Sequence, residues 1–169
     1  MYMGESALHL IGLSLFLGVG ATLFMDIWSV FLKRVLSVQP LNYALVGRWL
    51  GHFLHGQLVH VNIVKAATKQ HESIIGWAAH YVIGVVFAFT FILSSLWINV
   101  SLLSPLGAIV FGALTVIFPY FIMQPCFGMG IAGSKTPQPN SVRLKSLMAH
   151  VSFGVGLSLS LFFITVIYS

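Results

Sequence analysis

The chain has 169 residues, of which 58% are hydrophobic and only 7% are charged, and its net charge is +5. An ordinary soluble domain carries about 25% charged residues. The composition therefore excludes an ordinary soluble domain and indicates a protein that is solvated by a lipid bilayer. The single cysteine, Cys126, excludes an internal disulfide and a zinc site built from several cysteines.

Apolar runs predict an all-α integral membrane protein with a bundle of four transmembrane helices, which forms a single membrane domain over residues 1–169. In chain order the spans cover about residues 8–32, 74–97, 105–124 and 146–168. The segment before the first run has no positive charge and the run is too long for a signal peptide, so we expect this span in the mature protein. Pro119 lies inside the third run and Pro125 at its end, which predicts a kink because proline removes a helical hydrogen bond.

The basic residues indicate how the chain is oriented. All eight lysines and arginines fall in the connections 33–73 and 125–145, whereas the connection around Asn99 has none. Basic connections stay in the cytoplasm, so we expect both termini and the Asn99 connection on the other side of the membrane. Topology therefore explains the positive charge, and the expected partner is the lipid bilayer rather than nucleic acid.

The first cytoplasmic connection contains a predicted amphipathic helix over residues 41–54. One of its sides carries Val46, Trp49, Leu50 and Phe53, and another carries Arg48, His52 and His55. We expect this helix to lie on the inner membrane surface, with Trp49 as an interfacial anchor. Exposure to solvent is a sufficient explanation for His60 and His71, which follow in the same connection.

Three ionisable residues lie well inside the apolar runs: Asp26, His80 and His150. An Asp at mid-helix costs about 2.5 to 3.5 kcal/mol on insertion, so each such residue requires a reason. Counting about 1.5 Å per residue places the three side chains, and Gln124 at the end of the third span, at a similar depth in the inner leaflet. Small residues at steps of four beside them predict that they point into the bundle.

Spans two and four share a short pattern, Ala-His-x-x-x-Gly-Val, at residues 79–85 and 149–155. Both spans run from the cytoplasm outward, so the pattern is compatible with a parallel repeat of two helices plus two. Chance similarity in glycine-rich apolar sequence is the alternative.

Five strings together resemble a bacterial membrane family known as domain of unknown function 2938: GATLFMDIW, LNYALVGRWLGH, GWAAHYVIGVVFA, MQPCFGMGIAGSKTPQPN and RLKSLMAHVSFGVGL. The resemblance runs from about Gly18 to Leu159, and it implies a location in the bacterial inner membrane. It also implies that motif positions are occupied by Asp26, Arg48, His52, His80, Gln124, Pro125 and His150. It implies no activity.

The second cytoplasmic connection contains the string GMGIAG at residues 128–133, which matches GxGxxG but follows a membrane helix rather than a strand. Dinucleotide binding is therefore not expected. Lys135, Arg143 and Lys145 follow, and with Arg48 they could contact a phosphate or an anionic headgroup; a proline-rich turn with basic topology signals is the alternative. No GxSxG, P-loop or HExxH string occurs, so the usual hydrolase, nucleotide and zincin motifs are absent and catalysis is undecided.

The favoured hypothesis for the polar set is the binding of a ligand. Two histidines and one carboxylate, Asp26, His80 and His150, suit Fe(II) or zinc, and Gln124 and His52 are expected nearby. His80 and His150 could instead ligate a b-type haem from opposite sides. A small polar ligand is the third option for the same inner-leaflet pocket.

Two further hypotheses use the same residues. In a transporter or channel subunit, Asp26 and the histidines would relay protons or hold a polar solute, and four spans would require a homodimer or another membrane subunit. In a structural component, the polar layer would only hold the helices together by hydrogen bonds.

Overall fold

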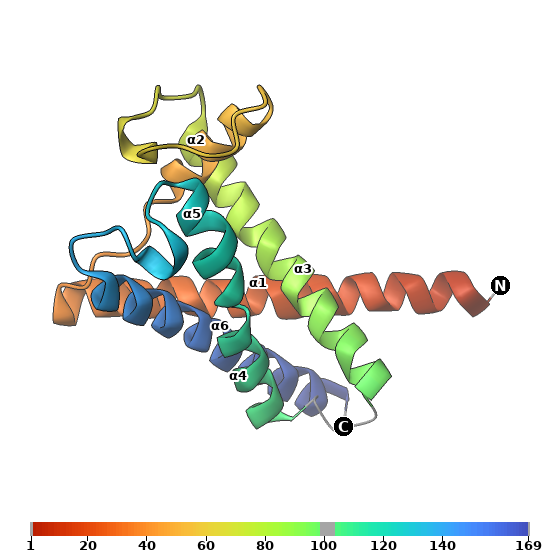
Figure 1. The fold of residues 1–169 in the computed structure, drawn as a ribbon. Helices are drawn as coiled ribbons and strands as arrows, with labels where there is room; N and C mark the ends of the chain where they lie inside the picture. Colours follow the sequence, from red (N-terminus) through yellow and green to blue (C-terminus); the bar gives the residue numbers. More distant parts are fainter. Residues whose placement is uncertain (1, 99–103, 169) are drawn as a thin grey trace. The chain divides into compact units, whose positions relative to one another are not determined.

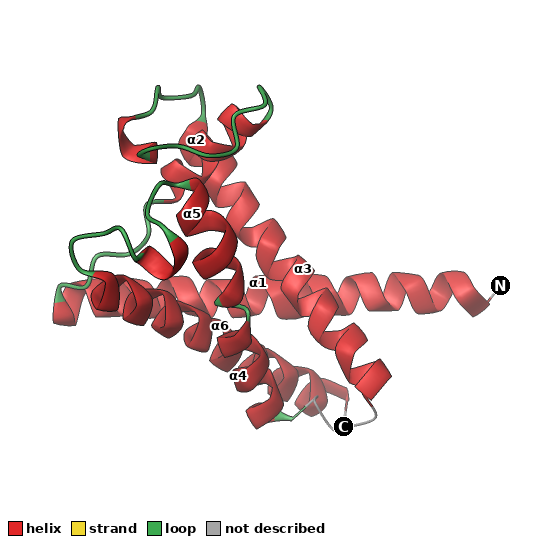
Figure 2. Cartoon of the chain, viewed as in Figure 1, coloured by secondary structure: helices red, strands yellow, loops and turns green. Residues whose placement is uncertain are grey.

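The computed structural model describes residues 2–98 and 104–168, and all regular secondary structure in these two ranges is helical (Figure 2). Four helical segments are long and apolar enough to cross a membrane: Ala7–Leu36, Glu72–Ser95, Pro105–Cys126 and Pro139–Val166. The predicted fold class, all-helical with four transmembrane helices, is therefore confirmed. The expectation for the connection around Asn99 lies outside the described residues.

Three long helices extend beyond the predicted spans: α1 (Tyr2–Leu36), α3 (Glu72–Ile98) and α6 (Pro139–Tyr168). α1 continues through Lys33 and Arg34 in its last turn, where cations are favourable because the C-terminal end of a helix is partly negative. α6 begins at a proline, which the first turn tolerates since its missing N–H has no intrahelical partner there. Charged or proline-containing ends are thus helical although they fall outside the apolar runs.

The third span is interrupted, as its proline predicts. α4 (Pro105–Leu114) ends just before Thr115, and a π-helical turn, η2 (Pro119–Met123), precedes the short α5 (Gln124–Cys126). Pro119 lacks an N–H, and its ring crowds the carbonyl four residues earlier, which is that of Thr115. The regular α-helical pattern therefore breaks from Thr115 onward, and Figure 1 shows the break in the ribbon between α4 and α5.

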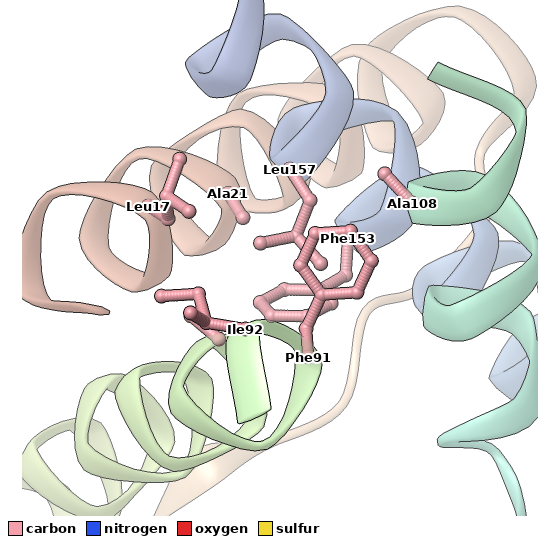
Figure 3. Packing of buried hydrophobic residues seen from close by; sticks show 8 residues of the cluster. Leu17, Ala21, Phe91, Ile92, Ala108, Phe153 and Leu157 are labelled. Carbon is pink, nitrogen blue, oxygen red and sulfur yellow. The ribbon is translucent and has the colours of Figure 1, made fainter. Parts of the chain in front are cut away.

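The described residues form two compact units, each with its own core. Unit 1 comprises Met1–Val38, Tyr81–Thr115 and Ala149–Ser169, and unit 2 comprises Gln39–His80 and Val116–Met148. The core of unit 1 draws on all four spans and contains Leu17, Ala21, Ala88, Phe91, Ile92, Ala108, Phe153 and Leu157 (Figure 3). The core of unit 2 is smaller, with Val46, Ile63 and Phe127 at its centre.

Glycines bring the helices of unit 1 into close contact. A methyl group added at Gly84 on α3 would overlap Thr22 on α1, and one added at Gly154 on α6 would lie 2.8 Å from the Ile109 Cα on α4. These two glycines hold the same place in the two copies of the Ala-His-x-x-x-Gly-Val pattern, and each packs against the span that precedes its own. This equivalence supports the predicted repeat.

Unit 2 contains the connections. After α2 (Tyr43–Phe53) come the 3₁₀ turns η1 (Ile63–Lys65) and η3 (Ile131–Gly133), the latter in the connection that leads to α6. Asn42 begins α2 by accepting a hydrogen bond from the Ala44 N–H at 3.1 Å. The helix predicted in the first connection is therefore confirmed.

Candidate functional site

Asp26 is paired with a side chain of the facing helix. It lies on α1 one turn beyond Thr22, and the Tyr81 hydroxyl on α3 donates a hydrogen bond to its Oδ2 at 3.0 Å. The close approach of α1 and α3 at Gly84 brings the two side chains within reach. The carboxylate thus lies inside a candidate span with a hydroxyl donor from another span.

His150 is paired in a similar way between α4 and α6. The Thr115 hydroxyl donates to the Gly112 carbonyl at 2.6 Å, and its oxygen lies at hydrogen-bond distance, 2.7 Å, from His150 Nδ1. Thr115 is also the residue at which the regular helix ends, so the proline-induced break and the histidine share one position in the span.

His80 and Gln124 both belong to unit 2. The His80 ring stacks on Tyr43, with ring centroids 4.1 Å apart, and its edge meets Trp77 at 5.8 Å. Gln124 is 2% exposed and its Nε2 donates to Ser146 Oγ at 3.0 Å. Its Oε1 has no hydrogen-bond partner among residues 2–98 and 104–168.

The four predicted polar residues are thus divided between the two units, with Asp26 and His150 in unit 1. A single layer that unites all four stays a prediction. In the part of the chain that the structure describes, no three His, Cys, Asp or Glu side chains gather in a way that could hold a metal ion. The predicted metal site therefore gains no support.

Arg48, on the polar side of α2, is buried. Its guanidinium forms a two-pronged ion pair with Glu72, at 2.9 Å from Nε and 2.8 Å from the terminal nitrogen. Its other terminal nitrogen donates to the carbonyls of Ile63, Val64 and Ala66 at 3.0 to 3.2 Å. The hydrogen bonds with Glu72 raise the pKa of Arg48 above its already high value, so the charge is permanent.

These contacts give Arg48 a role within the chain, whereas the sequence suggested an external anion. Glu72 was missed as its partner, although it is the only acidic residue in the connection 33–73. The sequence could have predicted this ion pair, since a single acidic residue among several basic ones is expected to pair with one of them.

Two histidines of the first connection are buried side by side, and the expectation that solvent explains His60 is wrong. His60 is 4% and His52 8% exposed, and their ring centroids lie 4.9 Å apart. His52 Nε2 lies 2.9 Å from the Ala67 carbonyl, but within the described ranges neither ring nitrogen of His60 has a hydrogen-bond partner. Burial, and then the proximity of His52, lowers the pKa of His60, so this imidazole is neutral at pH 7.

The comparison with known families decides the membership of the chain. The family described as "Protein of unknown function (DUF2938)" matches residues 15–164, which includes nearly all of both units. The chain belongs to this family. The resemblance seen in the sequence is therefore confirmed. No curated protein and no solved structure matches the chain.

The basic residues of the second connection in this DUF2938 protein lie at its surface. Arg143 is exposed and donates to the Ala132 carbonyl at 2.9 Å and to Asn140 Oδ1 at 3.1 Å, while Lys135 and Lys145 are exposed. In the GxGxxG string, Gly128, Gly130 and Gly133 all have positive φ, between 68° and 84°. The glycines therefore serve a tight turn, and a role in anion binding for the three cations stays a prediction.

Proposed function

We propose that this protein is a small proton-coupled transporter or channel subunit of the bacterial inner membrane, in which Asp26 and His150 take up and release protons. The observation that carries the proposal is that each of these ionisable groups lies inside a candidate span and is hydrogen-bonded to a hydroxyl on a facing helix. An ionisable side chain within a span marks an ion or proton pathway unless another reason for it is found.

The repeated construction of unit 1 adds support. The Asp26–Tyr81 pair joins α1 and α3, the Thr115–His150 pair joins α4 and α6, and each pair lies within about one turn of a close glycine contact. Transporters built from parallel repeats bind their substrate between the repeats, near the middle of the membrane. A pathway would use one ionisable group from each half of the repeat.

Tyrosine and threonine hydroxyls suit this role because they both donate and accept hydrogen bonds. The Tyr81 hydroxyl can remain bonded to Asp26 whether or not the carboxyl group is protonated. The Thr115 hydroxyl can likewise stay bonded to His150 Nδ1, as acceptor when Nδ1 carries a proton and as donor when it does not. The same pairs would bind a small polar solute, which is the ligand class that fits them better than a metal ion or haem.

Four spans are few for an alternating-access path, so we propose that the functional form is a homodimer or a complex with another membrane subunit. The proposed orientation has both termini on the non-cytoplasmic side, in line with the basic connections. A C-terminal alkaline phosphatase fusion should then be active and a C-terminal green fluorescent protein fusion dark. The opposite result would reverse the orientation.

Proton flux in liposomes tests the proposal. The purified protein is reconstituted with the pH dye pyranine inside, and a potassium gradient with valinomycin drives protons across the membrane. We expect wild-type flux above that of empty liposomes, and a loss of about tenfold or more in Asp26→Asn and in His150→Gln, the scale expected when a proton-transfer group is removed.

Thr90→Val is the matched control, since Thr90 is exposed on α3 and its hydroxyl donates to the Val86 carbonyl of the same helix. Each variant must elute as the wild type does on size exclusion and melt within a few degrees of it. No wild-type flux, or unchanged flux in both well-folded variants, would overturn the proposal and leave the polar pairs as structural hydrogen bonds.

A further inference from the structure

The connection between α2 and η1 exposes an unusual number of apolar side chains. Val61 is 99% exposed and Leu54 81% exposed, and four more large apolar residues between positions 53 and 64 are also exposed: Phe53, Leu58, Val59 and Val64. An apolar surface of this kind marks a contact with another apolar surface. The residues between 53 and 64 are called the apolar tip below.

The backbone of the apolar tip is fastened to the end of one span. The His60 N–H donates to the Cys126 carbonyl at 2.8 Å, and the Ile63 N–H donates to the Phe127 carbonyl at 3.1 Å. Cys126 is the last residue of the third candidate span. A methyl group added at Gly128 would overlap the Val61 carbonyl, so the backbones of these two segments are in direct contact.

A second fastening joins the same connection to the start of another span. Arg48 holds the carbonyls of Ile63, Val64 and Ala66, and it pairs with Glu72, the first residue of the second candidate span. The Trp49 indole N–H also donates to the Leu58 carbonyl at 2.8 Å, which ties the tip to α2. One candidate span thus ends and another begins at these contacts, and the ends of spans are where the hydrocarbon core meets the headgroups.

The charge of the connection suits an anionic surface. Residues 37–71 contain Arg48, Lys65 and Lys69 but no Asp or Glu. Arg48 is occupied by Glu72, which leaves Lys65 beside the tip and Lys69 a few residues further on. Basic residues next to a span attract anionic headgroups.

We propose that the apolar tip inserts into the boundary between the headgroups and acyl chains of the adjacent anionic leaflet, so that lipid covers these side chains. Val61, Val59 and Leu54 would enter the acyl region, while Lys65 would remain among the headgroups. Interfacial segments bury their apolar faces about 5–10 Å deep, which is within reach of side chains fastened at the ends of spans. The connection would thus be a membrane-inserted segment rather than a cytoplasmic loop, independent of any transport activity.

Site-specific fluorescence quenching tests the proposal. The only cysteine is replaced, as Cys126→Ser or, where that variant folds poorly, Cys126→Ala. Val61→Cys and, as the matched control, Thr68→Cys are then labelled with the environment-sensitive dye NBD; Thr68 is exposed in the same connection but lies outside the tip. The full-length proteins are reconstituted in vesicles of phosphatidylcholine and phosphatidylglycerol.

We expect lipids brominated in the acyl chain to quench the label at position 61 several-fold more than the label at position 68, and aqueous iodide to show the opposite order. Equal iodide quenching at both positions would place the tip in water and overturn the proposal. Protection at position 61 from both quenchers would also overturn it, because a second copy or another protein would then cover the tip. In vesicles without the anionic lipid, quenching by bromolipid at position 61 should fall; unchanged quenching would remove the assignment of Lys65 and Lys69 to anionic headgroups.

Discussion

The two units differ in how their polar groups are paired. In unit 1 the helices satisfy their own backbone, and polar side chains of facing helices meet in pairs such as Asp26–Tyr81. In unit 2 the connections lack long regular elements, so side chains must satisfy backbone carbonyls, and Arg48 does so for three of them. Loss of one contact should therefore matter more in unit 2 than in unit 1.

Removal of the Arg48 charge is the change with the largest expected effect. Arg48→Met removes the guanidinium from three carbonyls of the connection and from Glu72, which still accepts from the Lys69 N–H at 2.9 Å. Breaking one side of a buried ion pair costs about 3 to 5 kcal/mol. The two side chains are 11% and 17% exposed, so we expect the lower end of that range. Thermal unfolding in detergent measures the loss, and protease cleavage between Ile63 and Glu72 should become faster.

Arg143→Met is the control for Arg48→Met, because Arg143 is exposed and its hydrogen bonds are at the surface. It should melt close to the wild type. If the two variants had the same melting temperature, the ion pair would not stabilise the connection. The contrast between the units would then lose its main support.

The glycine contacts of unit 1 come next in size. Gly154→Ala places a methyl group 2.8 Å from the Ile109 Cα and from its carbonyl oxygen, and backbone atoms cannot move aside as a side chain can. We expect a loss of about 1 to 3 kcal/mol from this overpacking. Gly12→Ala is the matched control on α1, since nothing lies within 4 Å of its added methyl group. Comparable melting temperatures for both variants would contradict close backbone packing of α4 and α6.

The buried histidine of unit 2 predicts a pH dependence. The folded-state pKa of His60 is lowered from the ordinary value near 6.5, so the unfolded chain binds more protons than the folded one. Stability should therefore fall as the pH drops below about 6.5 toward the lowered folded-state pKa, and be regained at neutral pH. His60→Leu should melt at least as high as the wild type at neutral pH, because it removes two buried ring nitrogens that have no hydrogen-bond partner among the residues the structure describes.

The measurement is the difference in melting temperature between about pH 7.5 and about pH 5.5, the range over which histidines titrate. This difference should shrink in His60→Leu and persist in the control His55→Gln, since His55 is exposed. An unchanged difference in His60→Leu would mean that another group causes the acid sensitivity.

The contrast between the units also explains how far the sequence could predict the molecule. The spans, the irregular turn at Pro119 and the inward-facing glycines follow from local patterns of apolar length and spacing, so they were predicted. The Arg48–Glu72 pair joins residues 24 positions apart, and the backbone N–H of the buried His60 donates to the carbonyl of Cys126, much further along the chain. Such pairings could not be predicted, because contacts between irregular segments produce no periodic pattern in the sequence.

The amphipathic pattern of α2 misled for a related reason. From the sequence we expected an anion at Arg48 and the polar set near His52, but both side chains face backbone carbonyls in unit 2. The pattern correctly predicted a helix over Tyr43–Phe53 and could not identify what its polar side contacts.

The smallest expected change in stability concerns the Asp26 pair. Tyr81→Phe keeps the ring and removes only the hydroxyl that donates to Asp26, and hydrogen bonds between transmembrane helices contribute about 0.6 kcal/mol on average. Stability should therefore fall far less than in Arg48→Met. If Asp26 carries protons, the liposome flux should nevertheless fall clearly, since the hydroxyl positions the carboxylate and supports both of its protonation states. Normal stability with reduced flux would indicate that the pair belongs to a proton pathway. Unchanged flux with a small loss of stability would instead indicate that the pair only holds the two helices together.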